Sequence, residues 1–590
     1  MQSGEEKIAL KKRERYQCVA VSTKLNKGET RTMSKRAIAM VLMAALLLAT
    51  MMVFPRTAAG RQTNERAPAA LVAPTPPHPD TTVQLTEGTQ DELVNAIQTA
   101  QGNGHVTRIV LKANTPVAVN TDLPHFDLTD GKVLIIDFNG GWIDFNIQTS
   151  LWFEAQHGKP ENVLSIGTAG QDATLTFLSK LPDGLRVGDY IKVVSENTAP
   201  AGRGNRWKLG EAMKVKRIHG LEVTLEGKLM RQDLYKAGIR ASRYLGMPAG
   251  LWLMHPKLIG DLSYDTSQIR LRSLIKPRII SPDQKLTIGT FISLNDTVEA
   301  IVTDPSLSDG VDGAWPHTTY GIYSSSSKNT WVYRTDGSTV SPNGQKLRHL
   351  VDGIANTPPD KNAIYSYGND IGLHVTGLQA WDTLNVGISS HSGTWGYLYE
   401  NLSIKRTGGA AGIGIRGDYH TMKNINIAEE KNGWQIYNEI GSWRDSPIEA
   451  SPEQLVIDGG STVVSGFCLF TSSDAQKSGS PMPIGHIYTK NSPYWESSTS
   501  SALFDLNYET RFFMNGDRIK VTGSASKVFN LSGASYLRAD HLAIDLSGYK
   551  GDQITLFYAG AGSVVDVKNL TLIDPLHKAV FSGGEGTVRR

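Results

Sequence analysis

The feature that most constrains the fold is a repeat of short strands in the middle of the chain. When "LHVTGLQAWDTLNVGISSHSG", "LYENLSIKRTGGAAGIGIRG" and "MKNINIAEEKNGWQIYNEIG" are aligned, their first residues, Leu373, Leu398 and Met422, stand 25 and 24 positions apart. Each unit reads as strand, turn, second strand and turn. Such a repeat predicts a parallel β-solenoid, because one coil can bury its apolar face only against the next.

The rest of the chain also favours an all-β protein. Short strands such as "VLIIDF" and "LAIDLSG" recur, and 590 residues are too many for one ordinary globular core. A β-sandwich is the rival fold, but Asn-Gly hairpin turns are scarce. One helix is predicted in "TQDELVNAIQTAQGNG", where Leu93, Ala96, Ile97 and Ala100 form a single apolar stripe.

The N-terminal part has the order of an export signal. Residues 37–54 form an uncharged apolar run behind Lys35 and Arg36, and small residues follow. This predicts a signal peptide cleaved after Ala59, or an uncleaved anchor that would be the chain's one membrane contact. Either way we expect a chain exported across the inner membrane, to a periplasmic, outer-surface or secreted location.

Charge and cysteine content narrow the function classes. Residues 1–60 hold 11 Lys and Arg against 4 Asp and Glu, so without them the net charge falls from +3 to −4. That remainder lacks the basic surface of a nucleic-acid binder. Without Cys18 of the leader, Cys468 is a single thiol, expected to be buried. We expect no metal and no cofactor.

The stretch "GIGIRG" (412–417) fits the G-x-G-x-x-G pattern of dinucleotide-binding loops. That site needs a helix directly after the third glycine. The next residues here, "DYHTMKNINIAEEKNGW", alternate like a strand instead. We therefore place Gly412 and Gly414 in a turn and a small-residue strand position of one coil.

Several stretches carry a family resemblance. Residues 390–417 ("SHSGTWGYLYENLSIKRTGGAAGIGIRG"), 347–353 ("LRHLVDG") and 318–325 ("TTYGIYSS") resemble the right-handed β-helix of phage tailspike depolymerases in the pectin-lyase-like superfamily. Residues 187–229 are similar to a strand-rich segment before the main coils of such proteins, and the helix near residue 88 resembles their N-terminal cap.

The resemblance covers about residues 85–450 and implies a carbohydrate-processing fold shared by hydrolases, lyases, epimerases and binders. With an export leader and no virion-attachment head, the chain looks more like the tailspike-like proteins of bacterial exopolysaccharide clusters of the amylovoran and stewartan type. These imply a role in biofilm or capsule polymers, and tailspike packing implies a homotrimer.

The sequence thus predicts an all-β, right-handed parallel β-helix with a short helical cap. In chain order its parts are a basic leader with signal peptide or anchor (1–60), a Pro-rich linker (61–80), the N-terminal cap and first coils (81–180), a strand-rich inserted segment (181–245), the central β-helix with the active groove (246–450) and C-terminal coils (451–590).

Equivalent positions of successive coils stack about 4.8 Å apart, so residues distant in sequence form lines on one face. The alignment gives two corners: Asp382, Thr407 and Glu430 near one, and His391, Arg416 and residues 438–439 near the other. Hydrolysis of a glycosidic bond normally needs two carboxylates about 5 Å apart for retention, or up to about 9.5 Å for inversion. The predicted catalytic residues are Asp312, Asp352, Asp382 and Glu439.

Basic and aromatic side chains would suit an acidic sugar polymer, because aromatic faces contact pyranose rings and arginine binds carboxylates bidentately. The predicted substrate-binding residues are His317, Tyr320, Arg348, His349, His391, Trp395, Arg416 and Trp434. Structural roles remain open for them: Trp395 in the core, Arg416 paired with Asp418, and "PHTTYG" as a tight loop. A coil-corner aspartate is also a common turn former.

The main hypothesis is therefore an exported endo-glycosidase that acts on an acidic bacterial exopolysaccharide. The alternatives are a non-catalytic polysaccharide-binding or assembly protein, and a lyase or epimerase. A lyase would use a base such as His391 with an arginine or a metal.

Overall fold

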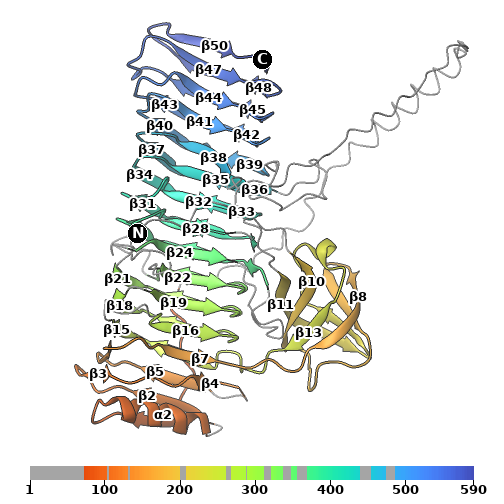
Figure 1. Ribbon diagram of the computed structural model, residues 1–590, viewed down its shortest axis with the longest axis vertical. Coiled ribbons are helices and arrows are strands. Elements are labelled where there is room, and N and C mark those ends of the chain that lie inside the picture. Colours follow the sequence, from red (N-terminus) through yellow and green to blue (C-terminus); the bar gives the residue numbers. More distant parts are fainter. Residues whose placement is uncertain are drawn as a thin grey trace, which may run out of the picture. The chain divides into compact units, whose positions relative to one another are not determined.

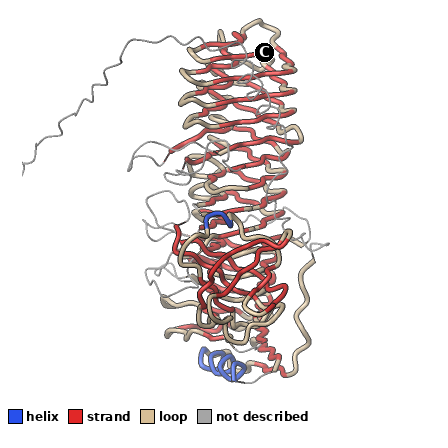
Figure 2. The backbone as a smooth tube through the Cα atoms, turned by 90° about the vertical axis from the view of Figure 1, so that its right-hand side faces the viewer, coloured by secondary structure: helices blue, strands red, loops and turns tan. Residues whose placement is uncertain are grey.

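The computed structural model describes residues 72–102, 105–129, 133–198, 208–260, 267–287, 289–310, 320–335, 347–354, 368–391, 393–438, 453–473 and 485–590. Figures 1 and 2 show that the strands stack as successive coils, with one helix at the end of the stack where the coils begin. The predicted parallel β-solenoid is confirmed, and its largest sheet has 16 strands. The leader and the apolar run 37–54 lie outside the described residues, among which no helix is long and apolar enough to cross a membrane.

The solenoid has three faces, and on each face the strands pair in parallel. Most coils contribute one strand to each face. The first face is sheet A: β1 (Thr81–Gln84), β2 (Val106–Val110), β5 (Val133–Asp137), β14 (Leu251–Met254), β17 (Arg278–Ile280), β20 (Ile301–Thr303), β23 (Trp331–Tyr333), β26 (His374–Thr376), β30 (Leu398–Glu400), β33 (His420–Lys423), β36 (Glu453–Asp458), β39 (His486–Lys490), β42 (Arg511–Asn515), β45 (Tyr536–Asp540), β48 (Val564–Lys568) and β51 (Thr587–Arg589).

The second face is divided between two sheets. The early coils form sheet B: β3 (Pro116–Val119), β6 (Trp142–Phe145), β15 (Lys257–Ile259), β18 (Asp283–Thr287) and β21 (Ser306–Gly310). The later coils form sheet D: β27 (Gln379–Trp381), β31 (Ser403–Lys405), β34 (Asn426–Glu430), β37 (Ser461–Val464), β40 (Tyr494–Ser497), β43 (Arg518–Val521), β46 (Ala543–Asp545) and β49 (Thr571–Ile573).

The third face, sheet C, carries the candidate site. Its strands are β4 (Phe126–Asp127), β7 (Leu151–Glu154), β16 (Ile269–Arg272), β19 (Thr290–Asn295), β22 (Tyr320–Ser325), β24 (His349–Ile354), β28 (Ile388–Ser390), β32 (Ile413–Ile415), β35 (Trp434–Asn438), β38 (Leu469–Ser473), β41 (Ala502–Leu506), β44 (Lys527–Leu531), β47 (Ile554–Ala559) and β50 (Ala579–Gly583). A short pair, β25 (Asp370–Ile371) and β29 (Thr394–Trp395), lies outside the three faces.

The predicted helix is α2 (Gln90–Gly102), and all four residues of its stripe are buried. It begins after Thr89, whose hydroxyl accepts a hydrogen bond from the N–H of Glu92 at 3.2 Å, as an N-cap residue does. The helix contacts β2, β3, β4 and β5 and thereby covers apolar surface of the first coils.

The inserted segment is a closed barrel. Its strands are β8 (Glu161–Ala169), β9 (Asp172–Phe177), β10 (Tyr190–Thr198), β11 (Lys208–His219), β12 (Glu222–Leu225) and β13 (Arg240–Arg243), with the 3₁₀ helix η1 (Gln232–Leu234) between the last two. The barrel begins at Glu161, whereas the sequence predicts coils up to residue 180. The difference arises because β8 and β9 pair antiparallel with each other and close the barrel.

Two buried ion pairs attach the barrel to the coils. Lys192 Nζ of β10 lies 2.7 Å from Asp296 Oδ1, and both side chains are fully buried. Lys328 Nζ lies 2.8 Å from Glu211 Oε1 of β11. Each pair joins a barrel residue to a coil residue, and loss of one partner from a buried pair is expected to be destabilising.

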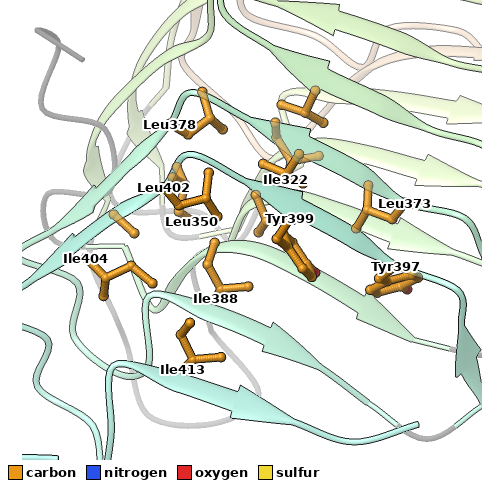
Figure 3. Packing of buried hydrophobic residues seen from close by; sticks show 14 of the residues in the cluster. Ile322, Leu350, Leu373, Leu378, Ile388, Tyr397, Tyr399, Leu402, Ile404 and Ile413 are labelled. Carbon is orange, nitrogen blue, oxygen red and sulfur yellow. The ribbon is translucent and has the colours of Figure 1, made fainter. Parts of the chain in front are cut away.

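Apolar residues of successive coils fill the interior. Figure 3 shows the packing in the middle coils, where Ile322, Ile388 and Ile413 come from strands β22, β28 and β32 of sheet C. Cys468 is a buried free thiol, as expected. "GIGIRG" covers Gly412 directly before β32, the strand itself and the turn after it, and the next element is strand β33 rather than a helix. The dinucleotide pattern is therefore accidental.

Candidate active site

The candidate site is a row of outward-facing side chains on sheet C. In register, Tyr323 pairs with Asp352, Asp352 with Ser389, and Ser389 with Gly414. The residues just before these (Ile322, Val351, Ile388 and Ile413) are in the core. Because side chains alternate between faces along a strand, the row itself faces outward.

Asp352 and His391 form the central pair. His391 Nε2 lies 3.2 Å from Asp352 Oδ2, and the side chains are 26% and 1% exposed. Burial alone would raise the pKa of Asp352, but His391, His349 and Ser389 outweigh it, and the net pKa is lowered. The carboxylate is therefore ionised at neutral pH. Its Oδ1 is buried and accepts no hydrogen bond from the described residues.

A cation and an aromatic ring extend the site towards the next coils. The Arg416 guanidinium carbon lies 3.6 Å from the centre of the Tyr437 ring, and Arg416 is only 6% exposed. The Tyr437 hydroxyl donates to Gln435 Oε1 at 2.8 Å, and Gln435 Nε2 donates to Ser472 Oγ at 3.0 Å. This network holds the guanidinium against the ring.

His349 lies at the start of β24, beside Tyr320, with ring centres 5.6 Å apart. Its Nδ1–H donates to the carbonyl of Val386 at 2.7 Å. Burial lowers the pKa of His349 to about 4, although Asp352 opposes the shift. His349 is therefore neutral at pH 7 and adds no charge to the site.

A polar cluster lies inside the coils, behind Asp352. The Tyr397 hydroxyl donates to Asp370 Oδ2 at 2.5 Å, and the Ser324 hydroxyl and the Ser327 N–H donate to Oδ1 at 3.0 and 2.8 Å. Burial raises the pKa of Asp370 to about 7. A Cβ on Gly353, the neighbour of Asp352, would overlap the Tyr397 hydroxyl oxygen. Gly353 thus leaves room for the cluster (Figure 3 shows Tyr397).

Several predicted residues lie elsewhere. Asp382 is in a turn at the corner between sheets D and C, with φ of 58°, and Arg406 bridges it to Glu429 at 2.6 and 2.7 Å. Hydrogen bonds from Arg406 lower the pKa of Asp382. This arrangement fits the turn-former alternative, so Asp382 and Asp352 are not brought into one group.

The two predicted tryptophans are interior residues. Trp395 is 2% exposed and packs in the core of the barrel, and Trp434 is 1% exposed and donates to Thr462 Oγ1 at 2.9 Å. Neither presents a ring face to a polymer, which corrects the expectation from sequence. Arg348 is half-buried and lies directly before β24. Asp312, His317 and Glu439 lie outside the described residues.

Three groups of the site were not predicted: Tyr323, Ser389 and Tyr437. Burial raises the pKa of Tyr323, with Asp352 adding to the effect, so its hydroxyl stays protonated. The strand register was the signal that could have found them, because each lies on an outward position next to a predicted residue. The described residues contain no group of three or more side chains that could hold a metal ion.

Comparison with known proteins gives remote similarities. No protein-family model matches the chain, and no curated protein matches it. Among solved structures, the tailspike protein gp49 from Pseudomonas phage LKA1 is 14% identical, with 80% of this chain and 76% of that chain covered and a TM-score of 0.47. The Gp54 tailspike of Acinetobacter baumannii bacteriophage AP22, solved with a capsular saccharide, is 11% identical, with 82% and 73% covered and a TM-score of 0.45.

The catalytic unit of a GH87 α-1,3-glucanase from Streptomyces thermodiastaticus is 12% identical, with 74% and 86% covered and a TM-score of 0.29. The structural neighbours thus include phage tailspikes, as the resemblance implies. Similarity this remote carries no inference about activity, which has to come from the chain's own residues.

Proposed function

We propose that this chain is a glycoside hydrolase that cleaves an acidic bacterial polysaccharide on the outer face of sheet C. The observation that carries the proposal is Asp352, a buried and ionised carboxylate with one oxygen that accepts no hydrogen bond from the described residues. An ionised carboxylate can take a proton from a water molecule, or attack an anomeric carbon, that reaches it.

The neighbours of Asp352 favour an acidic sugar. Arg416 brings positive charge to the face, His391 lies beside Asp352, and Tyr323 adds a protonated hydroxyl. Uronate or pyruvate groups of a polymer would be attracted to this charge, and hydroxyls would find donors and acceptors. Such groups are common in bacterial exopolysaccharides.

Hydrolysis also needs a carboxylic acid or an equivalent proton donor. Glu439 and Asp312 remain our predictions for that second carboxylate.

Elimination is the second candidate, because a histidine held by a carboxylate can remove the proton next to a uronate carboxyl group. His391 and Asp352 form such a pair. Elimination also needs a cation free to neutralise the uronate. Arg416 lies on the same face, so the products of cleavage decide between elimination and hydrolysis.

The test uses a panel of acidic bacterial exopolysaccharides, with neutral dextran as the control polymer. We expect new reducing ends and no ultraviolet absorbance from unsaturated sugars. Asp352→Asn should lower the rate at least about 100-fold. Asp505→Asn on β41, which changes a carboxylate in the same outward row, should leave the rate unchanged.

Unsaturated sugars would instead establish elimination. Binding without any cleavage would favour the non-catalytic alternative. Equal rates for Asp352→Asn and Asp505→Asn would remove Asp352 from the chemistry.

We also infer that residues 1–60 direct export, that the natural substrate is the cell's own exopolysaccharide, and that the chain forms a homotrimer. Fractionation of the producing cells tests export, and light scattering of the purified protein tests the homotrimer. A cytoplasmic monomer would contradict both.

A further inference from the structure

A polar hollow lies on the outer face of sheet C, nearer the start of the solenoid than Asp352. Its walls come from neighbouring coils: Asp122, Leu123, His125, Gln148, Thr149, Ser150, Trp152 and Arg270. Figure 1 shows β7 and β16, which carry its tryptophan and arginine, in the same sheet as β22 and β24.

The hollow is in the same outward row as Asp352. Trp152 pairs in register with Arg270, Arg270 with Ser293, Ser293 with Tyr323, and Tyr323 with Asp352. Four steps of about 4.8 Å separate Trp152 from Asp352 by about 19 Å. One sugar unit cannot touch both places, but a polymer that runs along the row can.

One wall is a stack of rings and cations. The rings of His125 and Trp152 are stacked, with centres 3.7 Å apart and an angle of 28° between planes. The guanidinium carbon of Arg270 lies 5.3 Å from the Trp152 ring, and that of Arg272 lies 4.7 Å away. Arg270 also lines the hollow, so a positive charge lies beside this ring stack.

The remaining lining is polar. Asp122 and Gln148 are exposed and Ser150 is half-buried, so a carboxylate, an amide and a hydroxyl border the hollow. Thr149 is buried and accepts a hydrogen bond from the N–H of Leu123 at 3.0 Å, which fixes the two loops relative to each other. This combination of hydroxyl partners and one cation matches an acidic sugar.

We propose that this hollow is a second carbohydrate subsite, which binds an acidic sugar unit of the same polymer chain whose glycosidic bond lies at Asp352. This proposal takes its ligand, an acidic polysaccharide, from the proposed function. It adds a second place on the protein where that polymer binds. Long chains can occupy both places, whereas short fragments can occupy only one.

The first test measures binding alone, so that it does not depend on cleavage. Affinity electrophoresis in gels that contain each acidic exopolysaccharide compares Asp352→Asn with the double variants that add Trp152→Ala or Arg270→Gln. We expect each addition to weaken binding about tenfold. The matched control adds Trp142→Ala, which removes another tryptophan of the early coils, with Lys257 5.0 Å from its ring but on sheet B.

Equal retardation of Trp152→Ala, Arg270→Gln and Trp142→Ala variants that unfold at the same temperature would overturn the proposal. If Trp152→Ala unfolds early, Arg270→Gln decides alone, because it leaves the ring stack in place. Equal weakening in neutral dextran gels would remove the acidic sugar from the proposal and so also contradict it.

The second test uses the active chain and compares polymer with short oligosaccharides cut from it. We expect Trp152→Ala to raise KM for the polymer and to leave the rate on oligosaccharides unchanged. Equal loss on both would contradict a remote subsite. Should the wild-type chain cleave nothing, the proposed function fails, while the binding test still decides whether the hollow holds sugar.

Discussion

The coils around Asp352 and those near the C-terminus both contribute strands to sheet C. They differ in the side chains that point from this sheet into the interior of the solenoid. In the C-terminal coils, Phe504, Phe529 and Phe557 stack with ring centres 4.7 and 5.4 Å apart, and Leu506 pairs in register with Leu531 behind them. In the middle coils, the inward positions beside Asp352 are Ser324 and Gly353.

The difference shows what each region is built for. The aromatic stack maximises apolar burial, which is the main source of stability in a solenoid. The middle coils give up such burial at Ser324 and Gly353, and the space holds the Tyr397 hydroxyl and the Asp370 carboxyl group. Buried polar groups fix geometry when their hydrogen bonds are satisfied. We therefore regard the C-terminal coils as scaffold and the middle coils as the part shaped for chemistry.

The largest expected effect on stability lies in the scaffold. Phe529→Ala should lower the free energy of unfolding by about 3–5 kcal/mol, because it opens a cavity between two stacked rings. The rate per folded molecule should not change. Denaturant unfolding and activity assays on the same preparation check both, and a large loss of activity in the folded fraction would break the comparison.

A smaller effect is expected from Gly353→Ala, since the new methyl group meets the Tyr397 hydroxyl. Overpacking of this kind costs about 1–3 kcal/mol, and here it should also displace Asp352 and lower kcat. Gly583→Ala on β50 is the control, because the nearest atom to its Cβ is 3.4 Å away. If Gly353→Ala keeps full kcat, the interior cluster does not position Asp352.

The smallest expected effect is a dependence of stability on pH. Burial raises the pKa of Asp370 to about 7, so between pH 5 and 6 the unfolded chain has lost this proton while the folded chain keeps it. Stability then falls as pH rises, by about 1 kcal/mol over that unit. Asp370→Asn should remove this part of the slope in denaturant unfolding. An identical slope in both proteins would contradict the role given to Asp370.

The fold was predictable because the sequence repeats a pattern of short strands and turns at regular spacing. The strand spacing predicted the solenoid, and the stripe on residues 90–102 predicted its cap. The register was less exact, since Leu398 pairs with His374 and Thr421, one residue away from the aligned Leu373 and Met422.

The site was only partly predictable. Asp352 and His391, both chosen from the sequence, lie 3.2 Å apart, and their roles stay a prediction. Trp434 shares its strand face with Ile436, and this alternation marks it as interior. Trp395 is buried because the inserted barrel packs over it, a contact between distant segments that no local pattern reveals. No local pattern reveals the contact between Tyr397 and Asp370 either, because it forms only when the coils stack.

A crystal structure of Asp352→Asn with an oligosaccharide cut from the cleaved polymer tests the central claim most directly. We predict a sugar chain along the outer row of sheet C, with a glycosidic oxygen within about 3.2 Å of the residue 352 side chain or of one water bound to it. A sugar chain bound instead at the corner of Asp382 and Arg406, with none over sheet C, would contradict it.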